Sequence, residues 1–128
     1  MKIAPNVYRQ LVEKPGPEAE GKYSNVYLIR AGRAAFFDSG YPGGAHLGSL
    51  LDLWKKTGDS ELVGVIVSHW HSDHSGGIKG LSDKTGCSIF SSPIEKAVIE
   101  QKSPGTLVDM AVSDGETLDL DCATLEFI

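Results

Sequence analysis

The chain has 128 residues, 41% of them hydrophobic, which predicts one domain over residues 1–128 with its own core. Its formal charge is −5, and no basic run exceeds Lys55-Lys56, so we expect no nucleic-acid partner. No apolar run is long enough for a membrane span, and the N-terminus lacks the apolar core of a signal peptide. The two cysteines, Cys87 and Cys122, form no CxxC motif; we expect two small buried hydrophobes in a reducing cytoplasm.

The first half of the chain predicts a loop, a hairpin and a helix, in that order. Residues 13–21 are dense in Pro and Gly and predict a surface loop. Residues 25–30 and 33–38 are rich in strand-forming residues and are separated by Ala31-Gly32, which indicates a β-hairpin. From Ala45 to about Thr57, the apolar residues recur at helical spacing and predict an amphipathic helix with a core-facing stripe: Leu47, Leu50, Leu51 and Trp54.

The second half alternates strands with helices and then predicts strands only. Residues 62–67 form a continuous apolar run typical of a strand buried on both faces, and a short helix is expected to end near Gly86. After a strand at 87–92, Ser92, Pro93 and Glu95 mark the start of a helix with a capping box, whose inward residues we expect to be Ile94, Ala97 and Val98. Strands follow from Leu107 onward. This order indicates an α/β layer structure.

Three of the four histidines lie within six residues, directly after the buried strand. His69, His71, Asp73 and His74 form an H-x-H-x-D-H pattern at a strand's C-terminal end, where α/β sheets place their sites. Residues two apart in an extended segment point the same way, so His69 and His71 could serve one cation and Asp73 and His74 a second. These donors suit zinc, with iron or manganese as alternatives. Gly76 and Gly77 are expected to let the backbone turn tightly behind the ligands.

This segment, SHWHSDHSGG, resembles the signature of the metallo-β-lactamase-fold hydrolases, and VYLIRAGRAAFFDSG resembles the N-terminal hairpin of that family. Within the superfamily the loop is most similar to glyoxalase-II-like thioesterases and related β-lactamase-like ribonucleases. The resemblance implies that His69 and His71 ligate a first metal and that Asp73 and His74 ligate a second. It implies that Asp73 also accepts a proton from the attacking water. Asp38 would support the ligand loop by hydrogen bonding; the alternative is an ordinary turn aspartate.

Two further residues near the motif have less specific interpretations. Trp70 lies between two of the ligands and could line a substrate pocket or pack against the sheet. His46, near the start of the expected helix, is interpreted as a surface histidine.

The resemblance also implies a fold of two similar halves, an αββα sandwich, of which this chain resembles the first half: a mixed sheet with helices on its outer face. The family carries further ligands beyond this region, whereas no histidine follows His74, so each metal would have only two ligands here. We expect an exposed apolar sheet face and therefore a partner. One hypothesis is a homodimer, and the other is that the chain is the N-terminal part of a complete hydrolase, lacking the C-terminal half.

The function implied is that of a metal-dependent hydrolase with two zinc ions, whose metal-bound hydroxide attacks an ester, thioester, amide or phosphodiester of a small-molecule substrate. The alternative is a non-catalytic metal-binding or interaction module that dimerises through the exposed sheet face.

Overall fold

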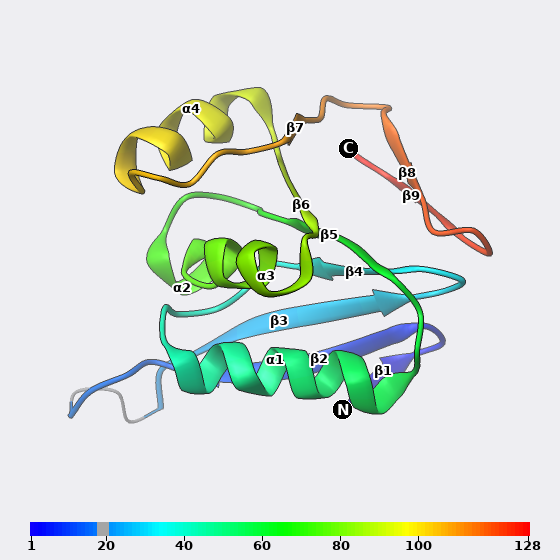
Figure 1. Ribbon diagram of the computed structural model, residues 1–128, viewed down its shortest axis with the longest axis horizontal. Coiled ribbons are helices and arrows are strands. Elements are labelled where there is room, and N and C mark those ends of the chain that lie inside the picture. The colour runs from blue at the N-terminus through cyan, green and yellow to red at the C-terminus, as the bar shows by residue number, and fades with distance from the viewer. Residues whose placement is uncertain (18–20) are drawn as a thin grey trace.

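A computed structural model describes residues 1–17 and 21–128, and in this part of the chain seven strands form one mixed sheet (Figure 1). The strands lie side by side in chain order. They are β1 (Lys2–Ala4), β2 (Val7–Glu13), β3 (Tyr23–Arg30), β4 (Ala34–Phe37), β5 (Leu62–Ile66), β6 (Ser88–Ser91) and β7 (Met110–Ala111). The predicted hairpin is confirmed as β3–β4, with Tyr27 opposite Phe37. The mixed sheet and the helices between its strands confirm the predicted α/β layer structure.

The sheet changes from antiparallel to parallel at β4, and this change positions the motif. Strands β1 to β4 pair antiparallel, whereas β4, β5, β6 and β7 run parallel to one another. Phe37 at the end of β4 pairs with Ile66 at the end of β5, and Ile66 pairs with Phe90 of β6. The segments that leave β4 and β5 therefore emerge together at one edge of the sheet.

Four helices are present in the described residues: α1 (Gly44–Thr57), α2 (Ser72–Ser75), α3 (Ile78–Thr85) and α4 (Pro93–Lys102). The helix predicted from Ala45 is α1, and its apolar stripe joins the larger core. The single short helix expected before Gly86 is two helices, α2 and α3, the second ending where Gly86 adopts a left-handed conformation. The larger core lies between these helices and one face of the sheet; its most enclosed residues include Val26, Leu28, Phe36, Leu50, Val65, Leu81 and Ile99.

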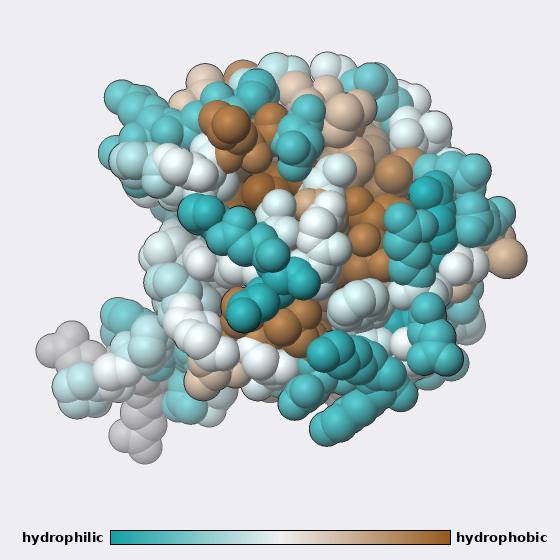
Figure 2. All heavy atoms as spheres, viewed as in Figure 1, coloured by the Kyte–Doolittle hydropathy of each residue, from teal (hydrophilic) through white to brown (hydrophobic). Residues whose placement is uncertain are grey.

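The opposite face of the sheet carries a smaller apolar cluster, built from Ala35, Ile66, Phe90 and Leu120. A hairpin formed by β8 (Thr117–Asp119) and β9 (Thr124–Glu126) packs on this cluster through Leu118 and Leu125. The expected open face is thus partly covered by the chain itself. Hydrophobic side chains still gather between α4 and this hairpin in the view of Figure 2.

Helix α4 begins as predicted but presents a different face to the core. Ser92 is the N-cap, and its Oγ accepts a hydrogen bond from the Glu95 N–H at 3.2 Å. The prediction for its inward residues was wrong for Ile94, which is 78% exposed, and for Ala97, which is also exposed; Val98 is half-buried, and Ile99 is 1% exposed. The face of α4 that meets the larger core is the one that carries Ile99.

Other differences from the sequence predictions concern short or polar segments. Residues 1–13 contribute two strands, β1 and β2, that the pattern did not reveal. The strands predicted from Leu107 onward are confirmed as β7, β8 and β9, but each is only two or three residues long, with loops between them. Cys87 is buried as predicted, but Cys122 is exposed because it lies in the β8–β9 turn. The loop predicted over residues 13–21 starts after β2, and its residues 18–20 lie outside the described part of the chain.

No helix in the described part of the chain combines the length and apolarity needed to cross a bilayer.

Candidate metal centre

The histidine motif leaves β5 in the middle of the sheet, and Asp38 leaves β4 next to it. The Asp38 N–H donates to the Ile66 carbonyl oxygen at 2.8 Å, so the two chain segments stay adjacent beyond the paired strands. Asp38 has φ +61°, a left-handed conformation that Asp and Asn adopt more readily than most residues. The sheet geometry therefore brings together two segments that are about 30 residues apart in the sequence.

Asp38 is the centre of the hydrogen-bond network, at 4% exposure. Its Oδ1 accepts from the Ser68 N–H at 2.7 Å, and its Oδ2 accepts from the Ser68 hydroxyl at 2.8 Å. The same Oδ2 lies 2.7 Å from His74 Nδ1. Because a carboxylate only accepts hydrogen bonds, His74 must carry its proton on Nδ1, which leaves Nε2 as the free ligand atom.

Ser68 extends this network to a second histidine. Its hydroxyl lies 2.9 Å from His69 Nδ1 while it donates to Asp38. The hydroxyl oxygen then accepts a hydrogen bond from the Nδ1–H of His69, so Nε2 is the ring atom that faces away from this contact. One buried carboxylate thus orients His74 directly and His69 through Ser68. Ser68 was missed by the sequence reasoning, although it directly precedes the motif.

The three histidine rings lie close together. The ring centroids of His69 and His71 are 4.8 Å apart, and those of His69 and His74 are 4.2 Å apart. Asp73 Oδ2 is 3.3 Å from His74 Nε2, the atom that the Asp38 contact leaves free. All four predicted ligands are therefore clustered, and each is half-buried or exposed.

Backbone contacts fix the loop that carries these side chains. The Ser24 hydroxyl on β3 donates to the Asp73 carbonyl oxygen at 2.6 Å, and the Ser39 hydroxyl donates to that of His74 at 2.9 Å. Gly76 has an ordinary φ of −61°, so the expected tight turn is not why glycine stands there. A Cβ at Gly76 would lie 2.3 Å from the Pro42 nitrogen, so close backbone packing requires the glycine.

Glu95 is the second residue that the sequence reasoning did not assign to the site. The capping box predicts that its carboxylate binds the start of its own helix, but Oε2 instead accepts from the Trp70 N–H at 2.9 Å. The Trp70 ring packs partly against the larger core and also lines a pocket; its contact with a substrate stays a prediction. His46 lies in α1, half-buried and away from the motif pocket.

The side chains of the motif carry donor atoms of the kinds that bind metal ions. The free Nε2 atoms of His69 and His74 and the nearby Asp73 carboxylate suit zinc chemistry. Within residues 1–17 and 21–128, however, no three His, Cys, Asp or Glu side chains are arranged to hold a metal ion. The residues fit a metal in the type of their donor atoms but do not form a complete ligand set among the described residues. The assignment of pairs to two metals stays a prediction.

Comparisons with known proteins concern the family and the fold of the chain. A sequence model described as the metallo-beta-lactamase superfamily matches residues 19–125. The chain is 31% identical to the "Beta-lactamase-like protein 2 homolog" of Caenorhabditis elegans, over 99% of this chain and 42% of that protein. It is 28% identical to an atrochrysone carboxyl ACP thioesterase of Emericella nidulans, over 98% of this chain and 37% of that protein. The chain thus spans about two fifths of these relatives.

A solved structure shows the same fold. The metallo-beta-lactamase from Pontibacter korlensis superimposes with a TM-score of 0.76 at 19% identity. The match covers 98% of this chain and 57% of that one. At this level of identity the likeness is evidence for the fold, and its coverage corresponds to one half of the larger domain.

Proposed function

Since the chain belongs to the metallo-beta-lactamase superfamily, whose model matches residues 19–125, we propose that it supplies part of the active site of a metal-dependent acyl hydrolase. The thioesterase relative favours a thioester or ester as the substrate. The observation that carries the proposal is the network in which buried Asp38 leaves Nε2 of His69 and His74 free. That orientation serves metal binding, because a histidine ligand needs an unprotonated nitrogen facing the ion.

Each polar residue of the site has a separate task in this proposal. His69, His71, Asp73 and His74 would hold the metal, with zinc as the proposed ion and further ligands supplied from outside the described residues. A bound zinc ion would supply Lewis-acid chemistry, polarising the acyl carbonyl and activating water. Asp73 would orient the attacking water and accept its proton at Oδ2. Asp38 and Ser68 hold the histidine rings in place, and Glu95 holds the loop through the Trp70 N–H.

The test compares the removal of two histidines of the motif with the removal of a histidine outside the motif. Wild-type chain, the double variant His69→Ala/His71→Ala and the control His46→Ala are incubated with zinc, dialysed and analysed for bound metal. Their hydrolysis of butyryl-N-acetylcysteamine, a neutral thioester, is then measured. Because the chain supplies only part of the ligand set, we expect weak zinc binding and slow zinc-dependent hydrolysis in the wild type and in His46→Ala, with both lost in the double variant.

The arrangement of ligands also supports a second candidate, a non-catalytic module. No three ligands converge in the described part of the chain, and an apolar area remains beside the β8–β9 hairpin. A wild-type chain that holds no zinc and is inert toward ester, thioester and phosphodiester substrates would favour this module. The homodimer stays a prediction, which a size-exclusion mass of one chain would contradict.

A further inference from the structure

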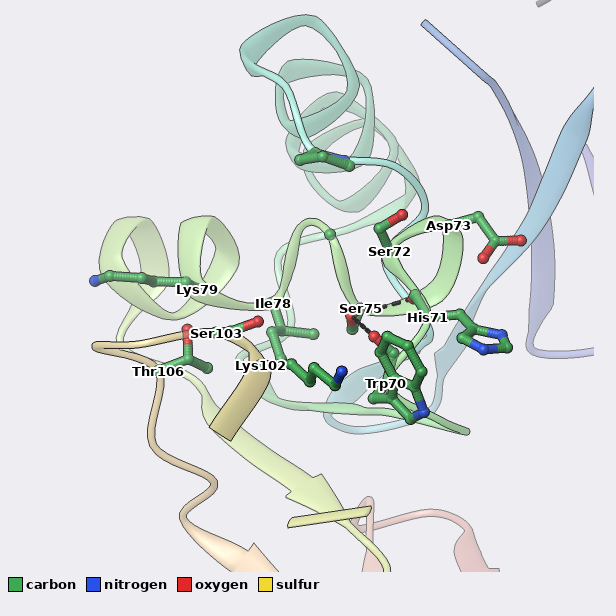
Figure 3. A pocket seen from close by; sticks show the side chains of 12 residues that line it. Trp70, His71, Ser72, Asp73, Ser75, Ile78, Lys79, Lys102, Ser103 and Thr106 are labelled. Carbon is green, nitrogen blue, oxygen red and sulfur yellow. Dashed lines mark hydrogen bonds between the residues drawn. The ribbon is translucent and has the colours of Figure 1, made fainter. Parts of the chain in front are cut away.

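A pocket of about 560 Å³ lies beside the histidine motif (Figure 3). Its walls come from the motif loop with α2, the start of α3 and the end of α4. The volume lies in the range of small-molecule sites. Trp70, His71 and Asp73 belong both to this pocket and to the motif. A substrate held at the histidines could therefore extend into the pocket.

One wall of the pocket is apolar. The Trp70 ring is half-buried, with its centroid 4.5 Å from that of His71, and the buried Ile78 lies on the α3 side. An aromatic face next to a polar site supports a flat or extended apolar part of a ligand. Trp70 therefore connects the motif to the rest of the pocket.

Lys102, the last residue of α4, supplies a positive charge to the same pocket. Its ammonium nitrogen lies 5.0 Å from the Trp70 ring centroid, and Figure 3 shows the side chain extending toward Trp70. Two other lysines nearby are paired: Lys79 with Asp83 at 2.9 Å, and Lys96 with Glu100. In the part of the chain that the structure describes, Lys102 has no such carboxylate partner. Its charge is available to a ligand.

Hydroxyl groups surround the open part of the pocket. Ser72, Ser103 and Thr106 line it, and Thr106 is only 5% exposed. Their hydroxyls form no hydrogen bond to other groups among residues 1–17 and 21–128. A hydroxyl can donate to an anionic oxygen, so these three groups add donors around the Lys102 ammonium.

We propose that this pocket is a subsite for an anionic group, a carboxylate or a phosphate, on the substrate of the hydrolase. The identification of its ligand as the substrate rests on the proposed function. Lys102 binds the anion, and Trp70 supports the chain that links it to the scissile bond. A cationic ligand does not fit, because Lys102 already occupies the Trp70 face. The side chains of His71 and Asp73 extend away from Lys102 (Figure 3).

Binding is tested on the metal-free chain, so that an anion cannot bind a metal ion instead. Glutarate and inorganic phosphate are titrated separately while the indole N–H signals of the two tryptophans are followed by NMR. Trp54 is an internal control because its Nε1–H donates to the Ser60 carbonyl oxygen at 2.9 Å, outside the pocket. The variants are Lys102→Gln, Lys102→Arg and the control Lys84→Gln, an exposed lysine at the end of α3.

We expect at least one anion to shift the Trp70 signal saturably while the Trp54 signal stays in place. Loss of the charge in Lys102→Gln should weaken binding about tenfold, whereas Lys102→Arg and Lys84→Gln should bind like the wild type. Saturation by glutarate alone identifies a carboxylate site, and saturation by phosphate alone identifies a phosphate site. No saturable shift with either anion, or equal affinity in Lys102→Gln, would overturn the proposal.

A kinetic arm separates this proposal from the proposed function. With zinc present, Lys102→Gln should lower about tenfold the ratio of kcat/KM for the anionic thioester glutaryl-N-acetylcysteamine to kcat/KM for the neutral butyryl thioester, whereas Lys84→Gln should keep the ratio of the wild type. If the neutral thioester is hydrolysed but no anion binds, the proposed anion subsite is wrong and the proposed hydrolase function stands. Anion binding at Trp70 without any hydrolysis overturns the hydrolase assignment and leaves the anion site in place.

Discussion

His74 Nδ1 and Asp38 Oδ2 lie 2.7 Å apart although 36 residues separate the two side chains in the sequence. The contact exists because β4 and β5 are parallel neighbours that end at the same edge of the sheet. It fixes which nitrogen of His74 carries the proton, and through Ser68 it acts on His69 as well. The ligand pairs predicted for the first and the second metal are therefore coupled through the Asp38 carboxylate.

Replacing that carboxylate tests the coupling. Asp38→Asn keeps the size and tolerates the left-handed backbone, but it removes the negative charge and one acceptor. We expect a loss of about 1–3 kcal/mol in the free energy of unfolding, measured by urea denaturation, together with weaker zinc binding. Asp121→Asn is the matched control, because Asp121 also has a positive φ, +69°, but is exposed. Equal effects of the two substitutions would contradict the central role of Asp38.

The contact between Glu95 and Trp70 predicts a local effect on the motif loop. Glu95→Ala removes the acceptor of the Trp70 N–H, and we expect faster hydrogen exchange at that amide and a stability loss of about 1 kcal/mol. Glu95→Gln keeps an acceptor oxygen and should restore most of the protection. The measurement is amide exchange followed by NMR. Protection of Trp70 that is unchanged in Glu95→Ala would rule out this role.

The exposure of two isoleucines on α4 predicts opposite outcomes for the same substitution. Ile99 is 1% exposed in the larger core, so Ile99→Ala should cost about 2–5 kcal/mol of stability. Ile94 is 78% exposed, so Ile94→Ala should change stability by about 0.5 kcal/mol or less. Chemical denaturation of both variants decides between the helix orientation seen here and the inward Ile94 that the sequence pattern favours.

Burial of Cys87 predicts a dependence of stability on alkaline pH. Desolvation raises the pKa of the Cys87 thiol, with the Thr85 hydrogen bond acting in the opposite direction. The unfolded chain then loses this proton at lower pH than the folded chain. The stability contribution is full below the ordinary thiol pKa and is lost as pH rises through the raised folded pKa.

Cys87→Ala removes this dependence. Between neutral pH and about pH 10, a range that spans the ordinary thiol pKa, the wild type should lose more stability than Cys87→Ala. Cys122→Ala should follow the wild type, because Cys122 is exposed. Parallel pH profiles for the wild type and Cys87→Ala, measured by thermal unfolding, would show that the buried thiol does not contribute.

The sequence by itself determined the order of the central elements and the identity of the candidate ligands. The apolar run at Leu62–Ile66 and the helical spacing before Gly58 depend on local periodicity, which a sequence displays directly. The H-x-H-x-D-H pattern likewise lies within one short segment. Asp38 was anticipated only through the family resemblance, and its contacts with Ser68 and His74 support that prediction.

Only the tertiary structure decided which distant groups meet. The parallel pairing of β4 with β5 brings Asp38 to Ser68, and the packing of α4 brings Glu95 and Lys102 to Trp70. No periodicity marks such contacts, because they depend on how whole elements pack rather than on neighbouring residues. The same reason explains the buried face of α4: its position over the sheet, and not its own apolar pattern, selects Ile99 over Ile94.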